Sequence, residues 1–311
     1  MEHQEREPTS GARGIPQFDE AAIGSVLQMA DVIRTMRQVL IEFSKGRIAQ
    51  PARRLFPTPV HGGFLGAMPA AAAHAVGAKL VTFFPHNAER NLHTHNASIV
   101  LFRPETGEPI ALLDGRLITE MRTAAVTAAY VDAVAPAEVG SLAILGAGVQ
   151  ARAHLEALAC VRTIPDIRIW NRTRSRAEAL AAAVGGRALD ARDAVHGADI
   201  VIVCTASPDP VLDGAWLKPG AKVASVGWRG PDGAELDAAT MAHTVIVDSR
   251  EGAATESGNV RRYNAHIFAE LGEVLAGDKV PDPRATVVFD SIGMACEDIA
   301  AASLAYECLT R

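Results

Sequence analysis

Residues 141–158 read SLAILGAGVQARAHLEAL, an apolar run followed by a glycine-rich turn and a helical segment. Gly146, Gly148 and Ala151 hold the spacing G-x-G-x-x-A. The first glycine permits a tight turn, the second lets the backbone approach a pyrophosphate, and the small third residue lets helix and strand pack closely. The helix N-terminus then offers free N–H groups to the phosphates. A structural glycine turn is the alternative, but the strand before and the helix after favour a dinucleotide site that includes Ala147, Val149 and Gln150.

The pattern of an apolar run followed by a helical segment recurs in the chain after this turn. Short apolar runs alternate with helical segments such as QARAHLEALACV and SRAEALAAAV; the runs are SLAILG, IRIWN, DIVIVCTA, AKVASVG, TVIVDS and TVVFDS. Continuous apolar strands alternating with helices indicate a parallel sheet covered on both faces. We therefore expect an α/β fold, with a Rossmann-type doubly wound parallel sheet over residues 119–294.

The first part of the chain has a different pattern. Residues 18–45 carry apolar positions at helical spacing, and KLVTFF, ASIVLF and IALLDG are typical of strands joined by turns. The last segment, GMACEDIAAASLAYECL, is a helix with an apolar stripe that we expect to pack back onto this part. We predict a discontinuous α+β domain over residues 18–118, completed by 295–311, behind a disordered tail over residues 1–17.

The end of the second predicted strand addresses which dinucleotide binds. An acidic residue there, about 20 residues after the turn, would bind the ribose 2′-hydroxyl of NAD. Asn171, Arg172 and Thr173 occupy that place instead. Arginine pairs with a 2′-phosphate through charge-assisted hydrogen bonds, so we expect NADPH to be preferred, with NADH possible. Arg174 and Arg176 are interpreted as ordinary surface charges.

Composition excludes several classes of partner. The formal net charge is −6, which gives no basic footprint for nucleic acid or for an anionic membrane. The longest small-apolar stretch, MPAAAAHAVGAKLVTFF, is broken by His74 and Lys79 and is too short to span a bilayer. The polar N-terminus lacks the apolar segment of a signal peptide. Four cysteines lie in apolar runs without CxxC spacing, so we expect buried thiols and a cytoplasmic location.

Several motifs in this order resemble the ornithine cyclodeaminase/μ-crystallin family, from about Phe18 to the C-terminus. They are GFLGAMPA, KLVTFF, DGRLITEMRTAAVTA, LGAGVQARAHLEAL, WNRT, IFAELGEVLAG and SIGMACEDIAAASLAY. WNRT and GMACED are most similar to the ketimine reductase (μ-crystallin-like) branch. The resemblance implies a homodimer of subunits with a substrate-binding and dimerisation domain and a Rossmann domain. It also implies a small imino or amino acid as ligand.

The resemblance further implies roles for individual residues. Arg53 and Lys79 match positions that bind a substrate carboxylate, and Arg122 matches an arginine between cofactor and substrate. Positions near the dinucleotide match Thr94 with His95, Thr205, Ala206, Val226, Gly227 and Ser291. On the residues alone, Arg53 is interpreted as a surface charge and Lys79 as an edge lysine.

One departure from the family bears on the chemistry. Arg229 stands where cyclodeaminases and alanine dehydrogenases have an aspartate that handles the amino group of ornithine. Asp232 is close, but on a loop a shift of three residues is not equivalent. The loss of the aspartate speaks against cyclodeamination, and Arg229 can add positive charge for an acidic substrate.

The remaining candidates complete a reductase site. Arg53 can hold a carboxylate in a bidentate pair, and Lys79, with its pKa lowered by burial, can donate a proton. Phe83 and Trp228 can form an apolar wall. His93 and His95 share a strand face, but no third ligand is evident, so we expect no metal site and interpret His95 as a hydrogen-bonding group near the cofactor.

Four functions stay open at this point. The preferred one is NAD(P)H-dependent reduction of a cyclic ketimine of the Δ1-pyrroline-2-carboxylate or Δ1-piperideine-2-carboxylate type to the L-amino acid. The alternatives are an ornithine cyclodeaminase that recycles NAD, an alanine-type amino-acid dehydrogenase, and a non-catalytic protein that binds NADPH and a small ligand.

Overall fold

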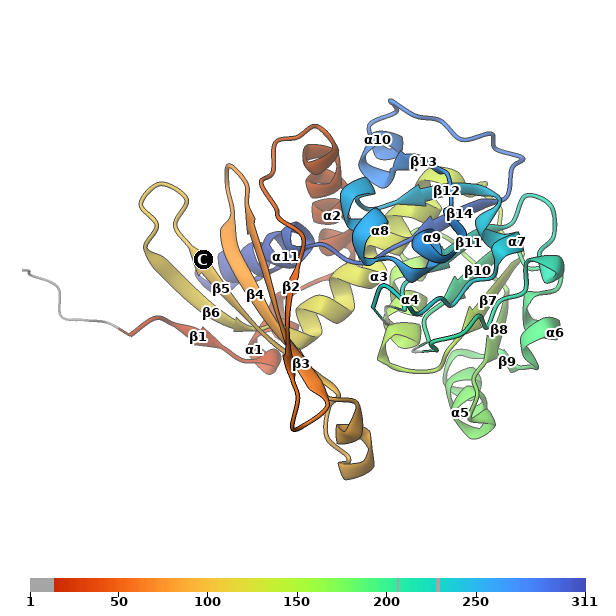
Figure 1. The fold of residues 1–311 in the computed structure, drawn as a ribbon, viewed down its shortest axis with the longest axis horizontal. Helices are drawn as coiled ribbons and strands as arrows, with labels where there is room; N and C mark the ends of the chain where they lie inside the picture. The colour runs from red at the N-terminus through yellow and green to blue at the C-terminus, as the bar shows by residue number, and fades with distance from the viewer. Residues whose placement is uncertain (1–13, 206, 228–229) are drawn as a thin grey trace, which may run out of the picture.

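The computed structural model describes residues 14–205, 207–227 and 230–311. Its strands form a six-stranded sheet and an eight-stranded sheet that lie at opposite ends of the chain's long axis (Figure 1). The first sheet uses the N-terminal strands and the second uses the strands that follow residue 140. The expected α/β class, with a parallel sheet and a separate second sheet, is confirmed.

The six-stranded sheet has the order β1-β6-β5-β4-β3-β2. Neighbouring strands are antiparallel except for β1, which runs parallel to β6. The strands are β1 (Gln17–Phe18), β2 (Arg54–Thr58), β3 (Gly63–Ala71), β4 (Val76–Phe83), β5 (His95–Phe102) and β6 (Pro109–Asp114). Between the first two lie the helices α1 (Glu20–Val26) and α2 (Met29–Ser44), and η1 (Pro85–Arg90) is a 3-10 turn.

One face of this sheet is turned inward. Met68, Lys79 and Ile99 pair across β3, β4 and β5 and therefore point to the same side. All three are buried, and the C-terminal helix α11 (Ala295–Leu309) packs against these strands. Lys79 is thus an interior residue, so the interpretation as an edge lysine is wrong. The alternation of the strand places it beneath α11.

The eight-stranded sheet has the order β13-β12-β14-β11-β10-β7-β8-β9, and all its strands are parallel. They are β7 (Ser141–Leu145), β8 (Asp166–Trp170), β9 (Arg187–Ala188), β10 (Ile200–Val203), β11 (Lys222–Ser225), β12 (Thr244–Val247), β13 (Ile267–Glu270) and β14 (Val287–Asp290). Its helices are α3 (Arg116–Val134), α4 (Val149–Ala159), α5 (Arg174–Val184), α6 (Ala191–Val195), α7 (Ala238–Met241), α8 (Arg250–Glu256), α9 (Gly258–Tyr263) and α10 (Leu271–Leu275), with a 3-10 turn η2 (Gly214–Trp216).

Both faces of the parallel sheet are buried. In β7, Leu142 and Ile144 belong to a core that continues into the antiparallel sheet, whereas Ala143 and Leu145 belong to a second core under α6 and α7. Packing on both sides explains why this strand is apolar at every position. The order also reverses at β7, which has β8 on one side and β10 on the other. Ligands of open α/β sheets bind at the carboxyl ends of the strands at such a point.

Parts of the sequence interpretation need correction here. Pro16 and Gln17 pair with Leu112 of β6, so the end of the expected tail is held by backbone hydrogen bonds. The rest of that tail, residues 1–13, lies outside the described residues. Cys160 is exposed because it caps the C-terminal end of α4 at the surface. The domain limits at 18–118 with 295–311, and at 119–294, stay predictions.

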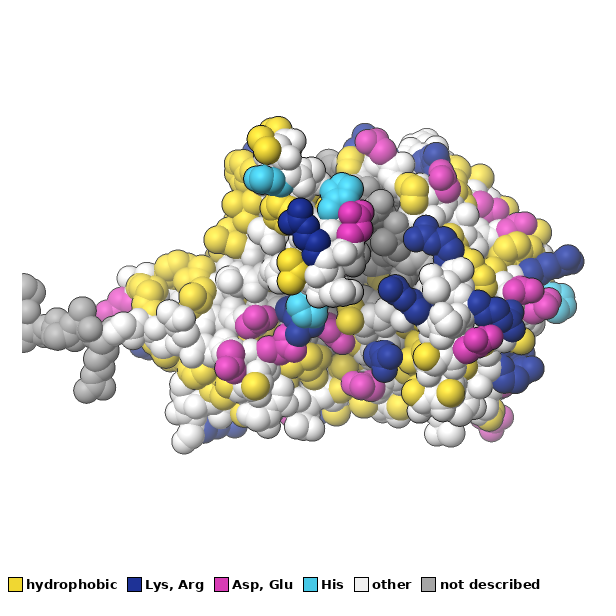
Figure 2. All heavy atoms as spheres, turned by 90° about the horizontal axis from the view of Figure 1, so that it is seen from below, with side chains coloured by type: hydrophobic (Ala, Val, Ile, Leu, Met, Phe, Trp, Pro, Cys, Tyr) yellow, Lys and Arg dark blue, Asp and Glu magenta, His cyan; other side chains and the backbone are white. Residues whose placement is uncertain are grey.

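The surface differs between the two ends of the molecule. On the face in Figure 2, basic and acidic side chains are mixed over the parallel-sheet end, whereas hydrophobic side chains gather towards the other end. Leu55, Phe56 and Leu80 are exposed on strands β2 and β4 of the antiparallel sheet. Within the described part of the chain, no helix has the length and apolar character to cross a membrane.

Candidate active site

A cavity of about 630 Å³ lies between the parallel sheet and the inward face of the antiparallel sheet. This volume is typical of a small-molecule or cofactor site. Every described residue that was predicted to bind the cofactor lines it: Thr94, Arg122, Gly146, Ala147, Gly148, Val149, Gln150, Asn171, Arg172, Thr173, Thr205, Val226, Gly227 and Ser291. Arg53 and Lys79 line it as well. The candidate substrate and cofactor residues therefore share one space.

The glycine turn has the shape that a dinucleotide needs. Gly146 has φ +123°, and a Cβ there would lie 2.6 Å from the carbonyl oxygen of Cys204, so only glycine fits. A Cβ on Gly148 would meet nothing within 4 Å, which leaves open space beside the start of α4. Ala151 is fully buried against the sheet. A tight turn, an open approach and a helix N-terminus together fit a bound pyrophosphate.

Asn171 has a structural part in this turn. Its Oδ1 accepts a hydrogen bond from the backbone N–H of Ala147 at 3.2 Å, and its Nδ2 donates to the carbonyl oxygen of Thr173 at 2.9 Å. The side chain thereby joins the first and second strand ends of the site. A carboxylate at this position could not make the second bond, because it lacks an N–H donor.

The arginines that follow divide into two kinds. Arg174 forms ion pairs with Glu178 and Asp190 at the surface, as its interpretation as a surface charge predicts. Arg172 and Arg176 both line the cavity, and neither forms an ion pair with a carboxylate of the described residues. Arg176 was interpreted as an ordinary surface charge, but it lies in the first turn of α5, which directly follows Arg172 and Thr173, and lines the cavity with them.

Two buried carboxylates shape the other end of the dinucleotide site. Glu235 accepts the backbone N–H groups of Thr205 at 2.7 Å and Gly227 at 2.8 Å, and the Ser225 hydroxyl at 3.1 Å. Burial raises the pKa of Glu235 to about 7, although these hydrogen bonds oppose the rise. One carboxylate thus holds the loops after β10 and β11 together.

Asp248 has the same function for the loop after β14. It accepts the hydroxyl of Ser291 at 3.1 Å and the backbone N–H groups of Ile292 at 2.9 Å and Gly293 at 2.8 Å. Burial, together with the nearby carboxylate of Glu297, raises the pKa of Asp248 to about 7. All three residues that it holds line the cavity.

Two buried cations close the cavity at the antiparallel sheet. Lys79 pairs with Asp298 and also donates to the Thr119 hydroxyl at 3.4 Å. Arg122 donates from Nε to Asp298 at 2.9 Å and from Nη1 to Glu297 at 2.7 Å. Burial lowers the pKa of Lys79 to about 8; Asp298 opposes this shift, whereas Arg122 adds to it. An amine with this pKa can hold a proton at neutral pH and still give it up.

Arg53 is held by the protein more tightly than the sequence suggested. Its Nε pairs with Glu256, and its Nη2 donates to the carbonyl oxygens of Ile292 at 2.6 Å and Gly293 at 2.8 Å. Its side chain is 12% exposed, so the interpretation as a surface charge is wrong. A bidentate pair with a substrate carboxylate needs two donors of the guanidinium, so Arg53 must release part of this set to form one.

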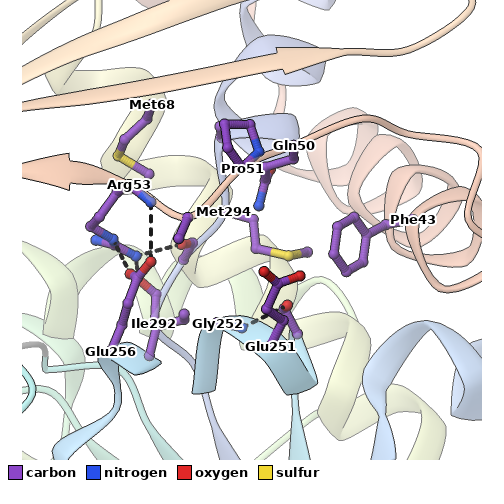
Figure 3. A pocket seen from close by; sticks show the side chains of 14 residues that line it. Phe43, Gln50, Pro51, Arg53, Met68, Glu251, Gly252, Glu256, Ile292 and Met294 are labelled. Carbon is purple, nitrogen blue, oxygen red and sulfur yellow. Dashed lines mark hydrogen bonds and ion pairs between the residues drawn. The ribbon is translucent and has the colours of Figure 1, made fainter. Parts of the chain in front are cut away.

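The Arg53–Glu256 pair also borders a smaller pocket of about 30 Å³. Figure 3 shows Arg53 directed at Glu256 on one side of this pocket, with Gln50 and Phe43 on the other. Its volume suits one or two water molecules rather than a substrate. Arg53 lines both spaces, so the pair separates them.

Phe83 is placed differently from the expectation, whereas His95 lines the cavity. Phe64 lines the cavity, whereas Phe83 packs behind it with ring centroids 5.6 Å apart. The ring of His95 lies 4.5 Å from that of Phe83, and its Nδ1 is 3.1 Å from the Thr94 hydroxyl. Among the described residues, no three His, Cys, Asp or Glu side chains are grouped to hold a metal ion.

Some predicted residues cannot be placed. Ala206, Trp228 and Arg229 lie outside the described residues. Asp232 is exposed and does not line the cavity.

Sequence reasoning did not find the carboxylates of this site. Asp298 and Glu297 were quoted only within a motif, and Glu235 and Glu256 were not singled out. A signal did exist for the first two, because acidic residues in an otherwise apolar helix, CEDIAAASLAY, need cationic partners if that helix is buried.

Comparison with known proteins identifies the family. The model of the ornithine cyclodeaminase/mu-crystallin family matches residues 18–311. The chain belongs to this family. Among curated relatives, the ketimine reductase mu-crystallin of Mus musculus is 44% identical over 285 residues, covering 89% of this chain and 91% of the relative. The Δ1-pyrroline-2-carboxylate/Δ1-piperideine-2-carboxylate reductase of Azospirillum brasilense is 34% identical over 305 residues, covering 95% and 96%.

Solved structures of family members have the same fold. The Δ1-pyrroline-2-carboxylate reductase of Thermococcus litoralis, in complex with NADH and L-proline, has a TM-score of 0.91 at 32% identity, covering 95% of this chain and 98% of that chain. An archaeal alanine dehydrogenase dimer with bound NAD has a TM-score of 0.90 at 26% identity, covering 95% and 96%.

Proposed function

We propose that this member of the family is an NADPH-preferring reductase of cyclic ketimines, converting substrates of the Δ1-pyrroline-2-carboxylate or Δ1-piperideine-2-carboxylate type to L-amino acids. One observation carries the proposal. The buried cations Lys79 and Arg122 line the same cavity as the dinucleotide turn at Gly146–Gly148. A small anion held by these cations would share this cavity with the bound dinucleotide. The names of the relatives support the same reaction class.

The residues have distinct parts in this reaction. Bound NADPH supplies the hydride that adds to C2 of the C=N bond. Arg122, with Arg53 once it releases part of its present bonds, binds the carboxylate and orients the ring. Lys79 donates a proton to the imine nitrogen, and its pKa of about 8 suits this step. The C=N bond thereby gains one hydride and one proton, which gives the secondary amine. The apolar side chains of Phe64 and Val81 exclude water from that end of the cavity.

The preference for NADPH rests on the end of β8. Arg172, Thr173 and Arg176 face the cavity without a carboxylate beside them among the described residues. Two guanidinium groups and a hydroxyl suit the 2′-phosphate, whereas NAD would leave this positive charge unpaired.

We propose in addition that two copies of the chain form a homodimer through the antiparallel sheet. The support is the outer face of this sheet, opposite to that of Lys79, where Phe56 and Leu80 are exposed. Exposed apolar groups gathered on one sheet face mark an interaction surface. Four free cysteines suit a cytoplasmic location, since a reducing compartment preserves thiols. Light scattering of the purified protein measures the assembly, and a monomeric mass contradicts the dimer.

The test of the function is a direct assay. The absorbance of NADPH is followed with Δ1-pyrroline-2-carboxylate and with Δ1-piperideine-2-carboxylate, and ornithine with NAD is run in parallel. We expect NADPH oxidation with at least one imine and no ammonia from ornithine. Proline and ammonia from ornithine, without NADPH oxidation by either imine, would identify a cyclodeaminase. Binding of NADPH without turnover of any of these substrates would identify a ligand-binding protein.

A further inference from the structure

Asp298 is the only described residue whose side chain bonds both Lys79 and Arg122. Its Oδ2 pairs with the ammonium of Lys79, and its Oδ1 accepts Nε of Arg122 at 2.9 Å. The side chain is fully buried and Lys79 is 2% exposed, so water does not compete for these bonds. Asp298 lies in the first turn of α11, whereas Lys79 belongs to β4 and Arg122 to α3. One carboxylate therefore joins three elements that are far apart in sequence.

The neighbouring carboxylate of Glu297 differs in its contacts. It bonds Nη1 of Arg122 at 2.7 Å and accepts the backbone N–H of Met294 at 3.1 Å. It forms no ion pair with Lys79. The two adjacent acidic residues therefore have different functions. Only Asp298 bonds the Lys79 ammonium and can fix its direction.

We propose that Asp298 is a positioning residue that fixes the Lys79 ammonium and the Arg122 guanidinium in the orientation needed for an imino acid beside the nicotinamide. It acts through these two cations and does not itself contact the substrate. This role rests on the proposed reductase function, but the bonds that define it involve only the protein's own side chains.

The electrostatic surroundings of Lys79 give the proposal a measurable consequence. The charged groups that face it come from the elements packed around it: Asp298 and Glu297 of α11, Arg122 of α3 and Arg53 before β2. Burial lowers the pKa of Lys79, and Asp298 raises it both by its charge and by its hydrogen bond. Burial raises the pKa of Asp298, but Arg122 and Lys79 together lower it below its ordinary value. Removal of the Asp298 charge must therefore lower the pKa of Lys79 further.

The experiment measures the lysine directly. The chain has five lysines, Lys45, Lys79, Lys218, Lys222 and Lys279, so carbon NMR of protein with labelled lysine gives few signals, and Lys79→Met assigns one of them. We expect the pKa of Lys79 to fall by about one unit or more in Asp298→Asn. Glu297→Gln is the matched control, and we expect it to cause a clearly smaller fall. An unchanged pKa in Asp298→Asn, or equal falls in both variants, overturns the proposal.

A second measurement covers the case in which Asp298→Asn does not fold. In the wild-type protein with labelled aspartate, the carboxyl carbon of Asp298 should move at the pH where Lys79 titrates, and this step should vanish in Lys79→Met. If the carboxyl signal of Asp298 does not move at the pH where Lys79 titrates, the proposal is overturned. This result needs no variant of Asp298. Neither measurement uses an imine. Failure of the reductase assay with a normal Lys79 titration therefore contradicts the proposed reaction and not the role of Asp298.

Discussion

A Cβ on Gly293 would lie 2.4 Å from Nη1 of Arg122, so the arginine can occupy its place only because residue 293 has no side chain. Gly293 also has φ +72°, a conformation that other residues rarely adopt. The turn that contains it is held by Asp248. A backbone turn and a buried guanidinium thus fix one another at the junction of the two sheets.

Substitution of Gly293 by alanine should displace Arg122 as well as strain the turn. The strain alone costs about 1–3 kcal/mol of unfolding free energy. We expect kcat/KM for the imino acid to fall about 10- to 100-fold, because small displacements of a positioning group are costly. The matched control is Gly107→Ala, since Gly107 has φ +74° with open space around its Cβ. Urea unfolding and steady-state assays of both variants test this, and equal losses of activity contradict it.

Arg172→Ala should separate the two dinucleotides. We expect the Kd for NADPH to rise about 10-fold or more, because a charge-assisted pair with the 2′-phosphate is lost, while the Kd for NADH changes little. Arg174→Ala is the control, since Arg174 is paired with Glu178 and Asp190. Fluorescence titration measures both constants, and similar losses for NADPH and NADH in Arg172→Ala contradict a role at the 2′-phosphate.

The pH dependence of kcat/KM should follow the protonation of Lys79. The protonated amine is the active form and its pKa is about 8, so kcat/KM should fall as the pH rises through about 8. Lys79→Met removes the donor and should lower kcat about 10²- to 10⁴-fold, with NADPH binding retained. An increase in kcat/KM above pH 8, or full activity of Lys79→Met, contradicts the assignment of the proton.

If Arg53 binds the substrate carboxylate as proposed, Glu256 competes with the substrate for it. Glu256→Gln removes the negative charge but keeps an acceptor for the backbone N–H of Arg53, which Glu256 binds at 3.1 Å. We expect KM for the imino acid to fall about threefold to tenfold with little change in kcat. Arg53 would then bind the carboxylate more strongly in the ground state and the transition state alike, which lowers KM alone. Glu251→Gln is the control, since Glu251 borders the same small pocket without an ion pair to Arg53 (Figure 3). A rise in KM for Glu256→Gln shows instead that the ion pair orients Arg53 for binding.

The sequence predicted which residues gather at the glycine turn because its signals are local. Gly146 and Gly148, the strand before them and the helix after them are contiguous, and the offset to Asn171 is a property of one βαβ unit. Residues 171–173 accordingly lie at the cavity that this turn opens.

The substrate end could be predicted only through the resemblance. Lys79 meets Asp298 because β4 and α11 pack together, and no local pattern encodes that contact. The same limit applies to Arg53 and Glu256. Phe83 rather than Phe64 was predicted to line the site, because the strand that contains Phe64 was not predicted. That strand, β3, places Phe64 at the cavity. Strand β13 was also missed, since four residues that lead directly into a helix give little period-2 signal.

The proposed reaction requires that a hydride pass from the nicotinamide to C2 of a cyclic imino acid. The direct measurement is a single-turnover reaction of NADPH, deuterated at the transferred position of C4, with Δ1-pyrroline-2-carboxylate, followed by mass spectrometry and NMR of the product. We expect L-proline with one deuterium at C2, together with one equivalent of NADP⁺. Proline without deuterium at C2, or oxidation of the cofactor without formation of proline, would contradict it.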